Sequence, residues 1–291
     1  MIFYASGLGV ALCPRVPSIG FPRFFGFGFR HLTSLPILHL PSRHNSSLYT
    51  AANMELIKNP KIAVLINTPP DGTDFPSVVK ECFREAFKSI LPTEELDFYD
   101  PVVERKFPDA SKYQLIVLSG GKIDADCSEP WVLGVLDYIR STAHDFPKTK
   151  MLAVCWGHQA VCRAFGGQVR NVPTGSVNMV KEISLTETGK KFFPFASSSG
   201  SYRVMAIHDS EVETPAPGFV SLAENQECFI NDANNILTFQ AHPEISHGLS
   251  WKLLLEEDQK HNRAFSAEKW GLDHPNDGLK LLERVVQWAA E

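Results

Sequence analysis

Cys155 is the residue in this sequence best placed to do chemistry. It directly follows the apolar run 151–154 and is followed by Trp156, Gly157 and a helical pattern. A cysteine in such a sharp strand-to-helix turn projects at the carboxyl edge of a sheet, where α/β proteins bind their ligands. The free N–H groups and partial positive charge at the start of the helix favour the thiolate, which is the attacking species. The pattern therefore predicts a cysteine nucleophile rather than a buried structural cysteine.

A base that takes and returns a proton is the second requirement of such a site. His242 follows the apolar run 236–240, so it too is expected at the end of a strand. Glu244 lies two residues further on, and Pro243 between them biases His242 toward an extended backbone. The two side chains can then project to the same side, where Glu244 would hold and stabilise the imidazole.

Two other histidines compete for the role of base. His158 lies inside the cysteine motif, but its place on the helix points it to another side. His208 ends the strand predicted at 204–207, and we expect a substrate-side or structural role for it rather than proton transfer.

Two N–H donors are needed for the oxyanion that forms when a nucleophile attacks an amide. One is expected from the main chain of Trp156, at the start of the helix. The other is expected from the glycine turn after the apolar run 115–118, with Gly121 as the first choice and Gly120 as the second. A glycine pair fits a plain turn equally well, and its place after a predicted strand is what favours the donor.

The elements that must position these residues alternate between strand and helix. Strands are predicted at 61–66, 95–99, 115–118 and 151–154, and helices at 74–89, 130–143 and 157–165. Such alternation predicts a parallel sheet with helices on both faces. After Gly167, short strands at 180–185, 204–207, 219–223, 227–230 and 236–240 predict a small antiparallel appendage. Two helices, at 247–261 and 276–290, close the chain.

The composition is that of a globular protein, with 44% hydrophobic and 21% charged residues. A net charge of −5 gives no electrostatic footprint for nucleic acid, and no apolar run is long enough to span a membrane. The six cysteines are scattered, which disfavours a disulfide framework or a zinc site and fits a reducing compartment. No cofactor and no metal ion are expected.

The first 53 residues contain no Asp or Glu and are rich in Phe, Ser, Gly and Pro. This bias resembles a mitochondrial transit peptide, although the prolines would break an amphipathic helix and Met54 could be the true start. We expect a disordered extension over 1–55, the catalytic domain over 56–262 and a helical tail over 263–291. A cytoplasmic location is expected, with the mitochondrial matrix as the alternative.

Three separated motifs together resemble the class I glutamine amidotransferase family: Ser119-Gly-Gly121, Cys155-Trp-Gly-His-Gln159 and Gln240-Ala-His-Pro-Glu244. The resemblance spans about residues 60–255 and implies a flavodoxin-like, doubly wound parallel sheet with a small antiparallel appendage. It implies a triad and two oxyanion donors at the positions already named, and substrate contacts at Gln159, Gly120 and His208. The chain departs from the family at Lys122, where the family often has proline.

This resemblance implies hydrolysis of the side-chain amide of glutamine through a thioester. No nucleotide-binding loop or second catalytic domain is recognisable, so the ammonia is expected to reach a separate synthase that amidates a metabolite. One alternative is a γ-glutamyl peptidase acting on glutathione-like conjugates. Another is a catalytically silent binding or regulatory protein.

Overall fold

The computed structural model describes residues 60–70, 75–92, 95–260, 264–274 and 276–291. The extension expected over 1–55 therefore lies outside the described residues.

A seven-stranded sheet with the order β2-β1-β3-β4-β11-β10-β9 forms the centre of the molecule. Five strands are parallel: β1 (Ile62–Leu65), β2 (Leu96–Tyr99), β3 (Leu115–Leu118), β4 (Lys150–Val154) and β11 (Ile236–Phe239). In β1, β3, β4 and β11 every residue is buried. Continuous apolar runs of this kind are what a parallel strand covered on both faces requires.

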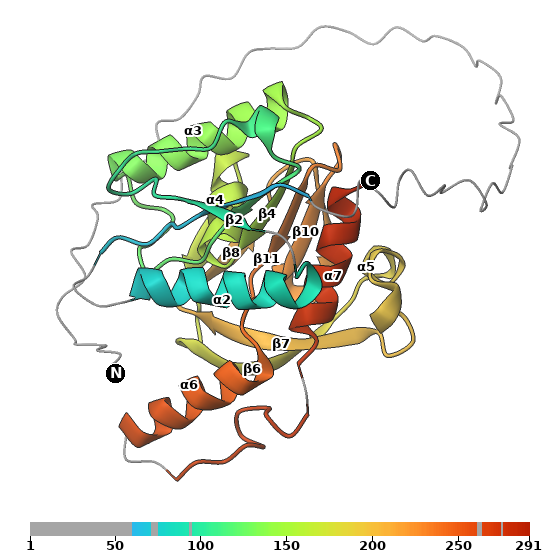
Figure 1. Cartoon of the computed structure of the whole chain (residues 1–291). Helices are drawn as coiled ribbons and strands as arrows, with labels where there is room; N and C mark the ends of the chain where they lie inside the picture. The colour runs from blue at the N-terminus through green and yellow to red at the C-terminus, as the bar shows by residue number, and fades with distance from the viewer. Residues whose placement is uncertain (1–59, 71–74, 93–94, 261–263, 275) are drawn as a thin grey trace, which may run out of the picture.

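Helices cover both faces of this sheet, as Figure 1 shows. On one face, α2 (Phe75–Ile90) and α7 (Gly278–Ala289) pack side by side and bury Phe83, Phe87, Leu281 and Val285. On the other face, α3 (Pro130–Asp145) and α4 (Trp156–Ala164) pack together over a second core cluster. The doubly wound α/β fold expected from the sequence is confirmed.

The prediction for the strands after Gly167 was only partly right. β6 (Val177–Ser184) and β7 (Ser201–His208) do form a separate antiparallel hairpin. However, β9 (Phe219–Ala223), β10 (Cys228–Asn231) and β11 extend the central sheet, because the buried strand β11 pairs with β4. The pattern also missed α5 (Glu187–Phe192) and the pair of short, largely polar strands β5 (Gln168–Asn171) and β8 (Ser210–Thr214).

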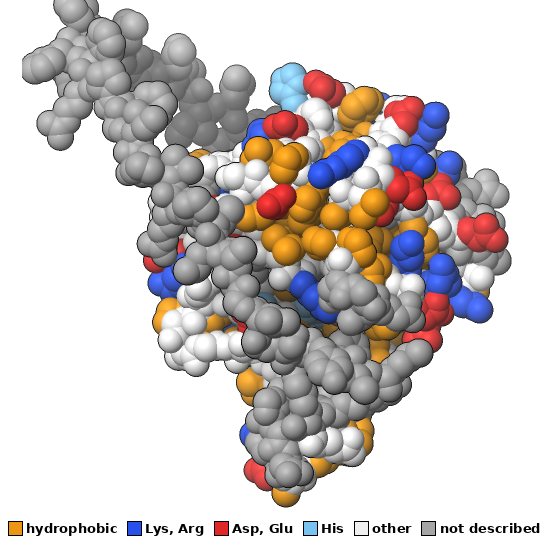
Figure 2. Space-filling view, turned by 90° about the vertical axis from the view of Figure 1, so that its left-hand side faces the viewer, with side chains coloured by type: hydrophobic (Ala, Val, Ile, Leu, Met, Phe, Trp, Pro, Cys, Tyr) orange, Lys and Arg blue, Asp and Glu red, His pale blue; other side chains and the backbone are white. Residues whose placement is uncertain are grey.

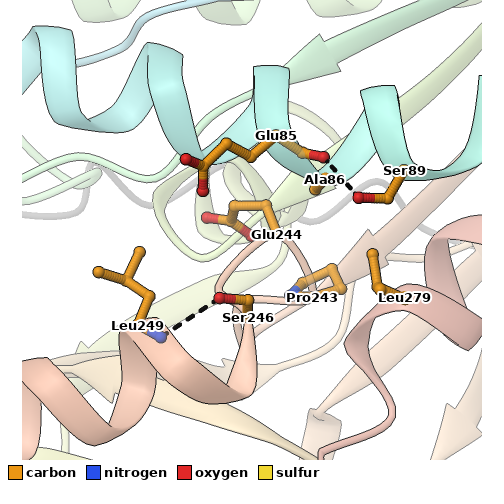
Figure 3. A pocket seen from close by; sticks show the side chains of 8 residues that line it. All are labelled: Glu85, Ala86, Ser89, Pro243, Glu244, Ser246, Leu249 and Leu279. Carbon is orange, nitrogen blue, oxygen red and sulfur yellow. Dashed lines mark hydrogen bonds between the residues drawn. The ribbon is translucent and has the colours of Figure 1, made fainter. Parts of the chain in front are cut away.

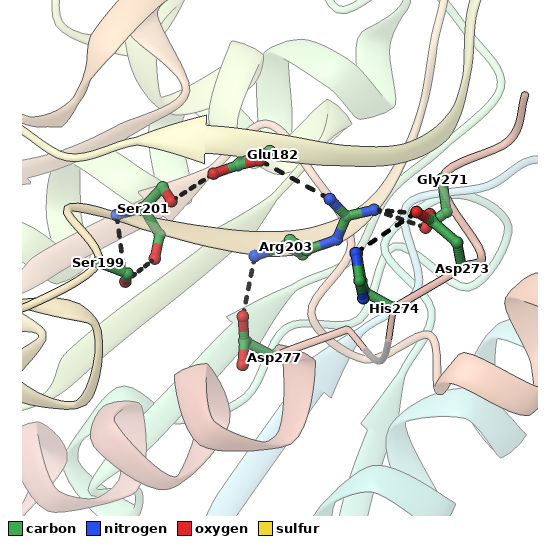
Figure 4. A network of polar contacts seen from close by, with 8 residues as sticks. All are labelled: Glu182, Ser199, Ser201, Arg203, Gly271, Asp273, His274 and Asp277. Atoms are coloured by element: carbon green, nitrogen blue, oxygen red, sulfur yellow. Dashed lines mark hydrogen bonds and ion pairs between the residues drawn. The ribbon is translucent and has the colours of Figure 1, made fainter. Parts of the chain in front are cut away.

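The hairpin β6–β7 is covered by α6 (His247–Lys260) and by the segment that follows it. Trp270 accepts a hydrogen bond on its carbonyl from the N–H of Val180, and Arg203 donates to the Gly271 carbonyl at 2.8 Å. The Arg203 guanidinium also lies 3.4 Å from the Asp273 carboxylate. The main-chain N–H of Arg203 donates to the Asp277 carboxylate at 3.0 Å (Figure 4). Arg203 thus ties the chain before α7 to the hairpin.

The face of the molecule drawn in Figure 2 carries charges of both signs. On the face in Figure 2, hydrophobic side chains gather near the centre, and basic and acidic side chains alternate around them. Among the described residues, none of the helices combines the length and hydropathy that a membrane span requires.

Candidate active site

Cys155 stands at the junction of β4 and α4, as the strand-to-helix pattern predicts. Its N–H donates to the carbonyl of Phe239 at 2.7 Å, which fixes the end of β4 against the end of β11. Its backbone has φ +52° and ψ −103°, a conformation that L-residues rarely adopt. Gly157 is required by a close approach: a Cβ there would lie 2.7 Å from the Leu118 carbonyl oxygen of β3. The backbone is therefore held closely both at Cys155, by the Phe239 carbonyl, and at Gly157, by the Leu118 carbonyl.

His242 and Glu244 come together just beyond the end of β11. Nδ1 of His242 lies 2.8 Å from Oε1 of Glu244, and both side chains are nearly buried, at 12% and 5% exposure. The N–H of His242 donates to the Met205 carbonyl of β7 at 2.8 Å, which holds the backbone in place. The sequence prediction that these two side chains face each other agrees with this geometry.

The main-chain carbonyl of Ile207, at the end of β7, lies beside both the thiol and the imidazole. It is 3.6 Å from Sγ of Cys155 and 3.2 Å from Nε2 of His242. Both ring nitrogens of His242 therefore face oxygen acceptors, an arrangement that favours the imidazolium, in which both nitrogens carry a proton. Sequence reasoning missed Ile207, since a main-chain carbonyl has no signature in residue type.

The pKa of His242 reflects the same surroundings. Burial lowers it, but the Glu244 carboxylate and the Cys155 sulfur outweigh burial and raise the pKa of His242 well above 6.5. An imidazole that holds its proton beside a thiol is suited to stabilise the thiolate and then to protonate a leaving group.

Gly120 and Gly121 lie next to these groups at the end of β3. A Cβ on Gly120 would stand 3.0 Å from Cε1 of His242 and 3.6 Å from Cβ of Cys155. A Cβ on Gly121 would collide with the Asn67 carbonyl oxygen at 2.3 Å and lie 3.3 Å from the Trp156 ring. Gly121 thus lies next to Trp156, and the glycine turn reaches Cys155.

Trp156 is itself held firmly. Its ring is buried and stacks on that of Trp131 from α3, with 5.1 Å between the ring centroids. The first turn of α4 is therefore anchored in the core, which fixes the main chain that follows the cysteine.

Gln159 and His208 meet at the carbonyl of Ser210. Nε2 of Gln159 donates to this oxygen at 2.7 Å and to Oε1 of Gln240 at 3.3 Å, while Nδ1 of His208 lies 3.1 Å from it. Burial, aided by Lys181 and His242, lowers the pKa of His208 to about 4. His208 is therefore neutral near pH 7, and it stands near His242 without taking part in the contact between His242 and Glu244.

His158 points away from Cys155, as its place on the helix predicts. Its Nδ1 lies 2.8 Å from Oγ1 of Thr238, and its ring stacks on Phe229. Burial lowers the pKa of His158 to about 3. Its position is that of a core residue.

A pocket of about 110 Å³ lies behind Glu244, between α2 and the start of α6 (Figure 3). Its walls are formed by Glu85, Ala86, Ser89, Pro243, Glu244, Ser246, Leu249 and Leu279. Among the described residues, Oε2 of Glu244 has no hydrogen-bond partner. The contact with His242 is therefore the hydrogen bond that places this carboxylate.

Comparison with known proteins shows which family the chain resembles. The model of the family described as Glutamine amidotransferase class-I matches residues 74–260. The chain is 72% identical over 238 residues to the glutamine amidotransferase-like protein chyE of Penicillium rubens, covering 82% of this chain and 100% of that protein. It is 25% identical over 243 residues to γ-glutamyl peptidase 2 of Arabidopsis thaliana, covering 80% and 94% of the two chains.

Solved structures show the same fold. A glutamine amidotransferase from Thermotoga maritima superimposes with a TM-score of 0.59 at 17% identity, covering 79% of this chain and 98% of that one.

Proposed function

The chain belongs to the glutamine amidotransferase class-I family, and on this premise we propose that it hydrolyses the side-chain amide of glutamine through a thioester on Cys155. The observation that carries the proposal is the contact of His242 with Glu244 at 2.8 Å, beside the cysteine of a strained strand-to-helix turn. A buried carboxylate that holds an imidazole next to a thiol is the arrangement of a nucleophilic triad.

In the first half-reaction, the Cys155 thiolate attacks the amide carbon of glutamine. The negative charge that develops on the amide oxygen is received by the N–H groups of Gly121 and Trp156. His242 then gives its proton to the departing nitrogen, so that ammonia leaves and a γ-glutamyl thioester remains. Glu244 stabilises the imidazolium before this transfer and orients the imidazole after it.

In the second half-reaction, His242 removes a proton from a water molecule, which attacks the thioester carbon. The same two N–H groups receive the charge on the oxygen, and collapse of this intermediate expels the Cys155 thiolate and releases glutamate. We propose that Gln159, Gly120 and His208 contact the substrate. The ammonia would pass to a separate synthase that amidates a metabolite.

A second candidate keeps the thioester and changes the leaving group. The similarity to γ-glutamyl peptidase 2 of Arabidopsis thaliana favours it, since cleavage of a γ-glutamyl peptide bond forms the same acyl-enzyme. His242 would then protonate a peptide amine instead of ammonia.

A substrate comparison tests both candidates. The purified protein is incubated with glutamine or with glutathione, and ammonia, free amine and the mass of Cys155-containing peptides are measured. Ammonia release that is lost in Cys155→Ser supports the first candidate, whereas cleavage of glutathione alone supports the second. The matched control is Cys162→Ser, since Cys162 lies on the same helix with its Sγ against the Thr214 carbonyl, and it should retain activity.

A covalent label separates both candidates from a silent site. A diazo-ketone analogue of glutamine should alkylate the Cys155 sulfur with loss of N2, so that the peptide carrying Cys155 gains the mass of the analogue minus that of N2 in the wild-type protein. Absence of both turnover and labelling contradicts the proposed chemistry.

A further inference from the structure

The glycine turn of the site is held from behind by the chain that leaves β1. The N–H of Asn67 donates to the Ser119 hydroxyl at 3.0 Å, and Nδ2 of Asn67 donates to the Ser119 carbonyl at 3.2 Å. Both residues are fully buried. The segment after β1 therefore fixes the start of the turn.

Two hydroxyl groups converge on the next carbonyl of the turn. Oγ of Ser119 donates to the Gly120 carbonyl oxygen at 2.8 Å, and Oγ1 of Thr68 donates to the same oxygen at 3.4 Å. Because the Ser119 hydroxyl already accepts the Asn67 N–H, its own hydrogen is free for Gly120. The Gly120 carbonyl is therefore drawn toward β1.

The opposite end of this peptide unit is the N–H of Gly121. In a planar trans peptide the C=O and N–H bonds point in opposite directions, so fixing the carbonyl also fixes the N–H. The carbonyl faces Thr68 and Ser119, while the position that a Cβ on Gly120 would take faces Cys155 and His242. The N–H of Gly121 is thereby turned away from β1 and toward the nucleophile's side of the turn.

Glycine makes such an external constraint necessary. Both residues of this peptide lack a side chain that would restrict rotation, and the close contacts described above leave room for nothing larger. A rotated peptide would withdraw the donor and present an oxygen to the developing negative charge.

We propose that Thr68 and Ser119 are positioning residues that hold the Gly120–Gly121 peptide with its N–H ready to receive the oxyanion. The inference rests on the proposed function, because it assigns Thr68 and Ser119 to the same acyl-transfer site. Neither residue contacts the substrate; each acts through the Gly120 carbonyl.

The test is a set of variants at both hydroxyls. Thr68→Val keeps the shape of the side chain and removes the hydroxyl, and kcat should fall about 3- to 10-fold with little change in KM. Thr68→Ser restores the hydroxyl and should recover most of the activity. Thr68→Val combined with Ser119→Ala should approach the loss of one oxyanion donor, about 10²- to 10³-fold in kcat.

Two controls separate this role from a general effect on folding. Thr149→Val removes another buried hydroxyl, one that donates to the Ala110 and Tyr113 carbonyls at the far end of β4, and should leave kcat unchanged. Alkylation of Cys155 by iodoacetamide forms no oxyanion, so its rate should be unchanged in Thr68→Val. Wild-type kcat in the double variant, or equal losses of turnover and alkylation, would overturn the inference.

A crystal structure of the double variant decides the question independently of turnover. The Gly120–Gly121 peptide should be rotated or present in two orientations, against a single orientation in the wild-type protein. A double variant whose carbonyl still faces residue 68 would refute the positioning role, even if the wild-type protein proved inactive on both substrates and the proposed function failed.

Discussion

Glu244 reaches back across Pro243 to place Oε1 2.8 Å from Nδ1 of His242. Pro243 restricts the backbone conformations of this segment, and the Met205 carbonyl accepts a hydrogen bond from the N–H of His242. A carboxylate and an imidazole only two residues apart are thus kept in contact by the backbone, with little dependence on other side chains.

Glu244→Gln should therefore uncouple the imidazole from its charge partner. We expect kcat to fall by at least about 10²-fold, because the imidazolium loses its stabilising charge. The pKa of His242 should fall with it, since the Glu244 charge helps to raise that pKa in the wild-type protein. The alkaline limb of the pH–rate profile should move to lower pH. Glu85→Gln, which alters the same pocket without touching His242, is the control, and an unchanged profile in Glu244→Gln would contradict this role.

The two glycines of the turn should respond differently to alanine. In Gly120→Ala the new Cβ would meet Cε1 of His242 at 3.0 Å, so we expect the imidazole to shift and kcat to fall by about 10- to 100-fold. In Gly121→Ala the Cβ would meet the Asn67 carbonyl oxygen at 2.3 Å, and backbone cannot move aside as a side chain can. The free energy of unfolding of this variant should therefore fall by about 1–3 kcal/mol. Urea denaturation and steady-state kinetics on both variants separate these effects. Equal stability losses in the two variants would show that the contacts are misjudged.

Acid should destabilise the protein through its buried histidines. The pKa values of His158 and His208 are lowered by burial to about 3 and about 4, from 6.5. Below pH 6.5 the unfolded chain binds protons that the folded chain does not, so stability falls as the pH drops toward 4. Each histidine contributes a slope of up to about 1.4 kcal/mol per pH unit.

Urea denaturation between pH 4.5 and 7 measures this slope. His158→Gln should make it shallower, whereas Thr149→Val should lower stability by a similar amount at every pH. A slope that is the same in His158→Gln and in the wild-type protein would rule out His158 as a source.

Loss of the Arg203 guanidinium should lower the free energy of unfolding more than loss of the Arg170 guanidinium, which is more exposed. Arg203→Met removes the contacts with Gly271 and Asp273 and should cost about 1–2 kcal/mol of unfolding free energy. Arg170→Met, which breaks exposed pairs with Glu211 and Glu213, should cost about 0–1 kcal/mol. Catalytic activity should be retained in both variants. A larger loss in Arg170→Met would reverse the assignment.

The parts of the site that the sequence predicts are those carried by side chains at strand ends. Cys155 and His242 each follow an apolar run, and residue type alone is enough to recognise such a run as a buried strand. Ile207 and Thr68 could not be predicted in this way. Ile207 acts through its main-chain carbonyl, and Thr68 acts through a hydrogen bond from the segment after β1 to the Gly120 carbonyl after β3.

The same distinction applies to the fold. The alternation of strand and helix up to Gly167 is local and predicts the parallel sheet. The place of β9 and β10 in that sheet depends on pairing with β11, which residue periodicity does not encode. The strand β5, with the sequence Gln-Val-Arg-Asn, is too short and polar to stand out from a loop.

The positive φ of Cys155 makes the residue that activity requires unfavourable for the stability of the fold. Holding a side-chain-bearing residue in this conformation costs on the order of 1–3 kcal/mol, a strain that glycine would relieve. Cys155→Gly should therefore melt at a higher temperature than the wild-type protein while losing all turnover. Selection of variants for thermal resistance alone would then favour removal of the nucleophile, so any stabilised form of this protein has to be screened for catalysis at every round.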